Sequence, residues 1–330
     1  MRPWSPLKNS GNTRPKSALI VGGYGFIGSN VAAHLLRNGW HIRIFDRVPQ
    51  IQTASNLPTT GTIEAVTGDL LDKECLREAL QGMGAVLYFA AHSVPSSNPR
   101  HMTGEIEGSM RSLDNLLTVM VDMGSATLVF PSSGGTVYGA CKKELIAEDD
   151  STAPISSYGM GKLLCEDLIK FYHRVHGLKY QILRVSNVYG CHFPRKVNQG
   201  VVDIFLQKIV GGLPIEVWGN PENVRDYIFI EDLCRSIARM LEIQPESDIY
   251  NVGTGIGHTV IDVIRTIEAV TGKRATVNFV TAPEGTLSRN VLDISKIRDA
   301  TGWTPDFSLT DGINLLHRRL VAHMKEISLP

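Results

Sequence analysis

The sequence has little cysteine, no excess of either charge and no long apolar run. Its 330 residues include five cysteines, and no two of them form a C-x-x-C pair. The odd number argues against a disulfide framework, and the missing spacing argues against a zinc site, so we expect neither, and a reducing cytoplasm fits best. The 33 basic residues equal the 33 acidic ones, which leaves no bulk charge for nucleic acid or an anionic membrane.

The apolar segments are also too short for a membrane span, which needs roughly 18 or more such residues. The first 16 residues are polar and contain three prolines, so they predict a flexible tail rather than a signal peptide.

Short apolar runs alternate with helical patterns in the first half of the chain. Strands are expected at 18–21, 41–45, 62–66, 85–89, 126–130 and 179–184. Continuous apolar strands separated by helices predict an α/β fold, a Rossmann-type doubly wound parallel sheet with helices on both faces.

After Gly190 the regular alternation of strand and helix patterns ends, and proline and glycine become frequent. Helices are expected there at about 200–211, 231–242, 259–271 and 310–325. This pattern predicts a smaller, mixed α/β C-terminal lobe. The expected division is a Rossmann domain at 17–188, joined again by about 224–252, and a substrate lobe from 189–223 and 253–330.

A glycine cluster follows the first predicted strand and opens a helix. Gly22, Gly25 and Gly28 would allow a tight turn close to a pyrophosphate, and the helix start would supply free N–H groups. Phe26 and Ile27 belong to the same loop. The spacing G-x-x-G-x-x-G displaces one glycine from the commoner dinucleotide fingerprint. The alternative is a plain glycine-rich turn.

Acidic residues follow the next two strands. Asp46 could accept hydrogen bonds from the adenosine ribose and repel a 2′-phosphate, which favours NAD over NADP. Arg47 opposes this preference, since it could pair with a 2′-phosphate; alternatively, Asp46 is only a turn residue. Asp69, before Leu70, either reaches the adenine amino group or caps the helix that begins near Asp72.

Tyr158 and Lys162 are four residues apart on a predicted helix and therefore share a face. The pKa of free tyrosine is about 10, and a nearby ammonium lowers it. Tyr158 could then take a hydroxyl proton while hydride leaves the same carbon for a nicotinamide. A surface Tyr/Lys pair is the alternative, which the glycine cluster makes less attractive.

These residues resemble the extended short-chain dehydrogenase/reductases, specifically the NAD-dependent nucleotide-sugar epimerases and dehydratases similar to UDP-glucose 4-epimerase. The resemblance covers nearly the whole chain after the tail. Its motifs occur in order at 21–28, 132–139, 154–162, 183–190, 225–227, 250–255 and 292–296. It implies that Lys162 also holds the nicotinamide ribose and that Ala90, Ala91 and His92 line the cofactor.

The resemblance further implies a site for the nucleotide diphosphate. Asn187 and Arg225 would bind its phosphates, and Arg289 would replace an arginine that relatives carry slightly earlier. The alternatives are a turn-stabilising role for Asn187 and a salt bridge from Arg225 to Asp226 or Glu231.

Three positions depart from the family pattern. Gly134 stands where a serine or threonine usually shares the O4 proton, so Ser133, or less favourably Thr136, would replace that hydroxyl. Gly135 and Thr136 stand where dehydratases carry an Asp-Glu pair. Neither residue can act as a carboxylate base, which disfavours dehydration and decarboxylation.

The resemblance therefore favours C4 epimerisation of a UDP-hexose or UDP-N-acetylhexosamine, in polysaccharide precursor synthesis. The alternatives are an NAD(P)H-dependent 4-keto-sugar reductase and, with less support, a dehydratase or a redox-sensing regulator. Asn290, three residues before Asp293, is smaller than the tyrosine that excludes N-acetyl sugars in some relatives.

Two helices suggest a homodimer. One stripe combines Ile106, Met110, Leu113, Leu117 and Met120, widened by Leu116, Val119 and Met123. The catalytic helix continues with Leu164, Leu168, Phe171 and Val175. Arcs this wide can pack on a partner, although the sheet alone could also cover them.

Overall fold

The computed structural model describes residues 16–48, 60–90, 102–124, 126–190, 200–281 and 287–327. A sheet of seven parallel strands, in the order β10-β6-β5-β4-β1-β2-β3, forms its centre. The strands are β1 (Ser17–Val21), β2 (His41–Asp46), β3 (Thr62–Thr67), β4 (Ala85–Tyr88), β5 (Thr127–Ser133), β6 (Tyr180–Val185) and β10 (Asp248–Val252). The strand order reverses between β1 and β4, where open α/β sheets commonly bind ligands.

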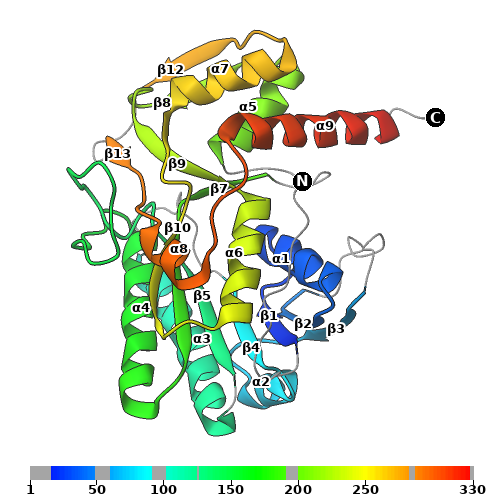
Figure 1. Ribbon diagram of the computed structural model, residues 1–330, viewed down its shortest axis with the longest axis vertical. Coiled ribbons are helices and arrows are strands. Elements are labelled where there is room, and N and C mark those ends of the chain that lie inside the picture. The colour runs from blue at the N-terminus through cyan, green and yellow to red at the C-terminus, as the bar shows by residue number, and fades with distance from the viewer. Residues whose placement is uncertain are drawn as a thin grey trace.

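Helices cover both faces of this sheet (Figure 1). One face carries α1 (Phe26–Arg37) and α6 (Ile230–Ile243), and the other carries α2 (Lys73–Leu80), α3 (Met102–Met123) and α4 (Ser157–His176). Along β1, Ala18 and Ile20 belong to one core, whereas Leu19 and Val21 belong to the other. Because both sides of the strand are buried, its sequence is continuously apolar, and the predicted doubly wound sheet is confirmed.

A smaller α/β lobe lies at the carboxyl end of the sheet (Figure 1). Its strands are β7 (Asn187–Tyr189), β8 (Ile215–Trp218), β9 (Val224–Phe229), β11 (Gly257–Thr259), β12 (Val277–Val280) and β13 (Arg289–Asn290). Its helices are α5 (Val201–Val210), α7 (Val260–Thr271) and α9 (Leu309–Ile327), whereas α8 (Ser295–Thr301) packs against β10 and α6 of the main unit. β9 pairs with β7, β11 and β13, while β8 and β12 form a separate parallel pair.

Only part of the segment 224–252 returns to the main sheet. β10 pairs with β6, but β9 pairs with β7, which follows β6 almost directly. The buried carboxylate of Asp226 in β9 accepts the N–H of Thr254 at 2.9 Å and that of Gly255 at 3.1 Å. This strand is therefore bound to the small lobe, and the expectation that all of 224–252 rejoins the main sheet was too broad. The boundaries between the two units remain a prediction.

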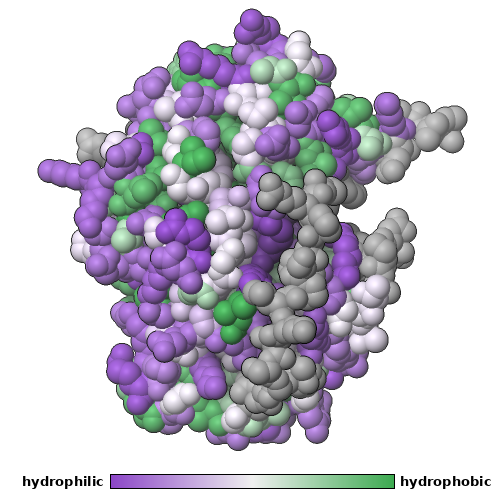
Figure 2. All heavy atoms as spheres, viewed as in Figure 1, coloured by the Kyte–Doolittle hydropathy of each residue, from purple (hydrophilic) through white to green (hydrophobic). Residues whose placement is uncertain are grey.

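The outer surface is mixed in character. Figure 2 shows polar and apolar side chains interspersed over the described residues of one face. Within those ranges, no helix is both long enough and apolar enough to cross a bilayer.

Candidate active site

The glycine loop between β1 and α1 is held by backbone-to-backbone contacts. Gly22 has a φ of 74°, and a Cβ there would lie 2.7 Å from the backbone nitrogen of Ala90. A Cβ on Gly28 would lie 2.5 Å from the carbonyl oxygen of Gly22. Gly25 precedes α1 and has no side chain to cap the first N–H groups. The loop therefore leaves a helix N-terminus open for an anionic ligand such as a pyrophosphate.

Asp46 lies at the edge of this loop. Its carboxylate accepts the N–H of Tyr24 at 3.1 Å, which places the end of β2 against the glycine loop. Arg47 is exposed, and Phe26 and Ile27 are half-buried against the core. The geometry is suited to the predicted ribose contact of Asp46, and that contact stays a prediction.

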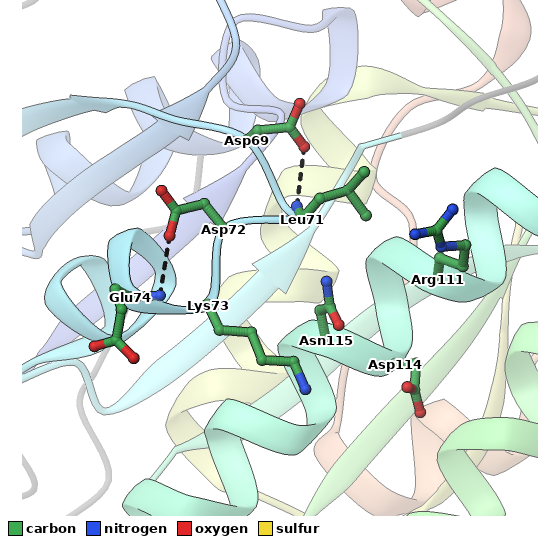
Figure 3. A pocket seen from close by; sticks show the side chains of 8 residues that line it. All are labelled: Asp69, Leu71, Asp72, Lys73, Glu74, Arg111, Asp114 and Asn115. Carbon is green, nitrogen blue, oxygen red and sulfur yellow. Dashed lines mark hydrogen bonds between the residues drawn. The ribbon is translucent and has the colours of Figure 1, made fainter.

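Asp69 and Leu70 follow β3 beside a surface hollow between the start of α2 and α3 (Figure 3). Asp69 accepts the N–H of Leu71 at 2.9 Å, whereas Asp72 accepts two N–H groups of α2 and forms its N-cap. The capping alternative for Asp69 is therefore wrong, because Asp72 has that role. Leu70 is buried, and its carbonyl accepts a hydrogen bond from Asn115 at 3.2 Å.

The carboxyl ends of β4 and β5 meet α3 and α4 around one small cavity. The residues that line it include Tyr88, Ala90, Glu105, Phe130, Tyr158 and Lys162. Ala90 thus connects this cavity to the glycine loop, since its backbone is the near neighbour of Gly22. Ala91 and His92 lie outside the described residues, so their predicted cofactor contacts have no structural account.

Tyr158 and Lys162 face this cavity from the first turns of α4. The helix begins after Ser156, whose hydroxyl accepts the N–H of Gly159 at 3.1 Å. Lys162 Nζ donates to the carbonyl of Pro131 at 2.8 Å and lies 5.8 Å from the centre of the Tyr158 ring. The ammonium is thereby anchored to β5 next to the tyrosine, as the i, i+4 spacing predicts.

One turn further along the same face of α4, Glu166 forms a buried ion pair that sequence reasoning missed. Its carboxylate is 2.7 Å from the guanidinium of Arg184 on β6, and both side chains are almost fully buried. Ser132 on β5 also donates to Glu166, at 2.5 Å. The four-residue spacing of the polar residues at 158, 162 and 166 could have indicated that Glu166 lies on the same face of the helix as Tyr158 and Lys162. This network fixes α4 against β5 and β6 below the cavity.

At Gly134, where the family resemblance leads us to expect a hydroxyl, another side chain fills the space. A Cβ on Gly134 would lie 2.6 Å from Cδ1 of Leu292, which is fully buried. Asn290 is also fully buried and donates to the carbonyl of Gly134 at 2.9 Å. The segment before α8 therefore packs against the loop after β5, and the buried hydrogen bond of Asn290 to this loop was not part of its predicted sugar contact.

The two candidate replacement hydroxyls have different surroundings. Thr136 Oγ1 is buried and has no hydrogen-bond partner among the residues that the structure describes. Ser133 ends β5, and its Oγ would be 3.9 Å from a Cβ on Gly135, the same side that faces the amide of Asn187. Ser133 therefore faces the side of the loop where the predicted substrate residue lies, and its catalytic role stays a prediction.

The predicted phosphate residues lie on neighbouring strands of the small lobe. Arg225 donates to the carbonyl oxygens of Val224 and Leu287, at 2.8 and 2.7 Å, and burial lowers its pKa. Within the described ranges it makes no salt bridge. The alternative pairings are wrong, because Asp226 accepts hydrogen bonds from Thr254 and its neighbours, and Glu231 pairs with Arg319.

Asn187 and Arg289 complete this group. Asn187 donates to the carbonyl of Asp226 at 2.9 Å, which leaves its Oδ1 on the side of Gly135. Arg289 donates to the carbonyl of Glu144 at 3.2 Å. Two arginines held by carbonyl oxygens keep their positive charge available for an anion.

Comparison with known proteins agrees with this geometry. Residues 18–253 match the model of the NAD dependent epimerase/dehydratase family. The chain belongs to that family. The glycine loop and its uncapped helix fit the dinucleotide on which members depend.

Relatives within the family differ in their reactions. The chain is 30% identical to a putative UDP-glucose 4-epimerase of Methanocaldococcus jannaschii, over 93% of this chain and 98% of that one. It is equally 30% identical to an Escherichia coli dTDP-4-dehydro-6-deoxyglucose reductase, over 92% and 98%. The crystal structure of the UDP-glucose 4-epimerase of Thermus thermophilus with NAD is 31% identical, with a TM-score of 0.82 over 92% and 99% of the chains.

Proposed function

We propose that this protein is an NAD-dependent epimerase that inverts C4 of a nucleotide sugar, a UDP-hexose or UDP-N-acetylhexosamine. The observation that carries the proposal is the single cavity in which Tyr158 and Lys162 lie with Ala90, next to the glycine loop. Bound NAD would supply reversible hydride transfer at C4 of the sugar. The O4 hydroxyl of the sugar would then face Tyr158, and its C4 carbon would face the bound NAD.

The residues of this chain would divide the work in three parts. Tyr158 accepts the O4 proton as the 4-keto sugar forms and returns it when the alcohol is restored, assisted by Ser133. Lys162, anchored on Pro131, favours the tyrosinate by its positive charge. Arg225, Arg289 and Asn187 hold the diphosphate, so that the sugar can turn over while the nucleotide stays bound.

The absence of a carboxylate at Gly135 and Thr136 supports simple C4 chemistry over dehydration. Within C4 chemistry, one relative favours a second candidate function. The E. coli protein of equal identity is named a dTDP-4-dehydro-6-deoxyglucose reductase. The second candidate is therefore an NAD(P)H-dependent 4-keto-sugar reductase, which would use the same residues.

The two candidates differ in their need for reductant. The protein should be incubated with UDP-glucose, UDP-GlcNAc, UDP-glucuronic acid or a 4-keto sugar nucleotide, with and without NAD(P)H, and the products read by NMR. An epimerase forms product without added reductant. Turnover that requires stoichiometric NADPH would instead establish the reductase. Conversion of UDP-glucose but not UDP-GlcNAc would refute the size role of Asn290.

Replacing Tyr158 by phenylalanine tests the catalytic assignment in either case. The Tyr158→Phe change removes only the hydroxyl, so we expect turnover to fall by about 10²–10⁴-fold, the usual contribution of a general acid/base. NAD uptake, measured by absorbance after gel filtration, should be unchanged. A variant with normal turnover would show that another group carries the proton.

We also propose that the protein forms a homodimer through α4. Its outer surface exposes Met160, Phe171 and Val175, each more than a third exposed. On α3, by contrast, Leu113, Leu116, Leu117, Val119 and Met120 are buried within the chain. The predicted α3 stripe is therefore covered mainly by this chain's own helices and sheet, and α4 would supply most of the interface. Light scattering of the chain with Phe171→Glu and of the unaltered chain tests this assignment.

A further inference from the structure

One carboxylate in the Tyr158–Lys162 cavity has no part in the reaction proposed above. Glu105 lies in the first turn of α3 and lines the cavity beside these two residues. Its Oε2 is buried, and no donor within the described part of the chain hydrogen-bonds to it. Buried carboxylate oxygens are normally paired, so an unpaired one that borders a ligand cavity indicates a group directed at the ligand.

Glu166 on the neighbouring helix α4 is a carboxylate whose role is structural, and its hydrogen bonds can be compared with those of Glu105. Glu166 on α4 is fully buried, and Arg184 and Ser132 satisfy both of its oxygens, whereas Glu105 is partly exposed and its buried Oε2 lacks such a donor. A carboxylate that serves only packing is thus paired here, whereas Oε2 of Glu105 has no donor among the described residues.

Among the residues that the structure describes, the charges that line the cavity come from two elements. Lys162 contributes an ammonium from α4, and Glu105 contributes a carboxylate from α3. Cys165 and Tyr88 add no charge at pH 7, because burial raises the pKa of Cys165 to about 11 and raises that of Tyr88 above its ordinary value. Among the described lining residues, and leaving Tyr158 aside, the formal charges of Lys162 and Glu105 cancel, and removal of Glu105 would leave +1.

The nicotinamide end of the cofactor is the part of the ligand that must lie near this lining. Tyr158 handles the proton of the hydroxyl whose carbon exchanges hydride, so the nicotinamide ring must lie next to that same carbon. The ring is a cation in NAD⁺ and neutral in NADH. A carboxylate at this position therefore stabilises the two redox forms unequally.

We propose that Glu105 makes this chain hold the oxidised cofactor in preference to the reduced one, by balancing the charge of Lys162 beside the nicotinamide. The proposal rests on the proposed function, which places the cofactor here. It also favours the epimerase over the reductase, because an epimerase must rest with oxidised cofactor, whereas a reductase must exchange it for NADH.

The experiment measures cofactor selectivity directly. The purified protein is equilibrated with an equimolar excess of NAD⁺ and NADH, separated from free cofactor, and the two forms it retains are released and quantified. We expect Glu105→Gln, which keeps the shape and removes the charge, to lower the retained NAD⁺/NADH ratio by about tenfold. Glu105→Asp, which keeps the charge, should preserve most of the original ratio.

Glu107→Gln is the matched control, because Glu107 lies on the same helix but is exposed and 3.8 Å from Arg111. It should leave the ratio unchanged, and thermal melting should show that all variants fold. An unchanged ratio in Glu105→Gln would overturn the inference. If the unaltered chain retains neither form, the proposed function itself is overturned.

Discussion

Two loops at the carboxyl edge of the main sheet contain glycines at positions where a side chain would clash, and the atoms that cause the clash differ between the two loops. After β1, the atoms that exclude a side chain at Gly22 and Gly28 are backbone atoms. After β5, the atom nearest to a Cβ at Gly134 belongs to the side chain of Leu292. The first loop is constrained by backbone atoms, those of Ala90 at Gly22 and those of Gly22 at Gly28, whereas the second is constrained mainly by a side chain 158 positions later.

This difference explains why the two loops follow the family pattern to different degrees. A backbone contact has no substitute, so a dinucleotide loop requires glycine wherever the helix packs this closely. A side-chain contact can be exchanged, since a smaller residue at 292 would leave room for a side chain at 134. The catalytic loop can therefore change its hydroxyl without a change of fold.

The largest effect is expected in the first loop. Gly28→Ala would place a Cβ 2.5 Å from the carbonyl oxygen of Gly22, so α1 must move away from the loop. We expect a loss of about 3 kcal/mol in the free energy of unfolding and loss of NAD uptake. Urea denaturation and cofactor retention measure the two. Ala33→Gly in the middle of α1 is the control, with an expected loss of about 1 kcal/mol and normal NAD uptake.

A smaller effect, and one that can be reversed, is expected in the second loop. Gly134→Ala should cost about 1–2 kcal/mol in the free energy of unfolding, because Leu292 must be displaced. In a chain that also carries Leu292→Val, the same change should cost about 1 kcal/mol less, because only the 3.1 Å contact with the carbonyl oxygen of Arg184 stays tight, and this difference is the coupling in a double-mutant cycle. Strict additivity in that cycle would show that the two glycine loops are constrained in the same way.

The smallest effect is expected at the edge of the first loop. Asp46→Asn keeps an acceptor for the N–H of Tyr24, so stability should change by less than about 1 kcal/mol. It removes the charge that would repel a 2′-phosphate, so the ratio of NAD to NADP affinity should fall by about tenfold. Fluorescence titration with the reduced forms measures that ratio. A ratio that stays constant would separate Asp46 from cofactor selection.

Much of the fold and part of the site could be predicted because local patterns carry them. The continuous apolar run at 18–21 required burial on both faces, and the i, i+4 spacing of Tyr158 and Lys162 placed both on one side of a helix. β9 was misplaced, since its apolar sequence does not say which sheet it joins. Glu105 was missed because a glutamate at the start of a helix usually faces solvent.

The sequence by itself determined the doubly wound sheet, the dinucleotide loop and the Tyr158–Lys162 pair, because each depends on residues close together in the chain. Only the tertiary structure decided three other features. It brought Leu292 and Asn290 against Gly134, joined Glu166 to Arg184, and left Oε2 of Glu105 without a donor among the described residues that line the cavity with Lys162. These depend on distances between segments far apart in sequence, which no local period or spacing encodes.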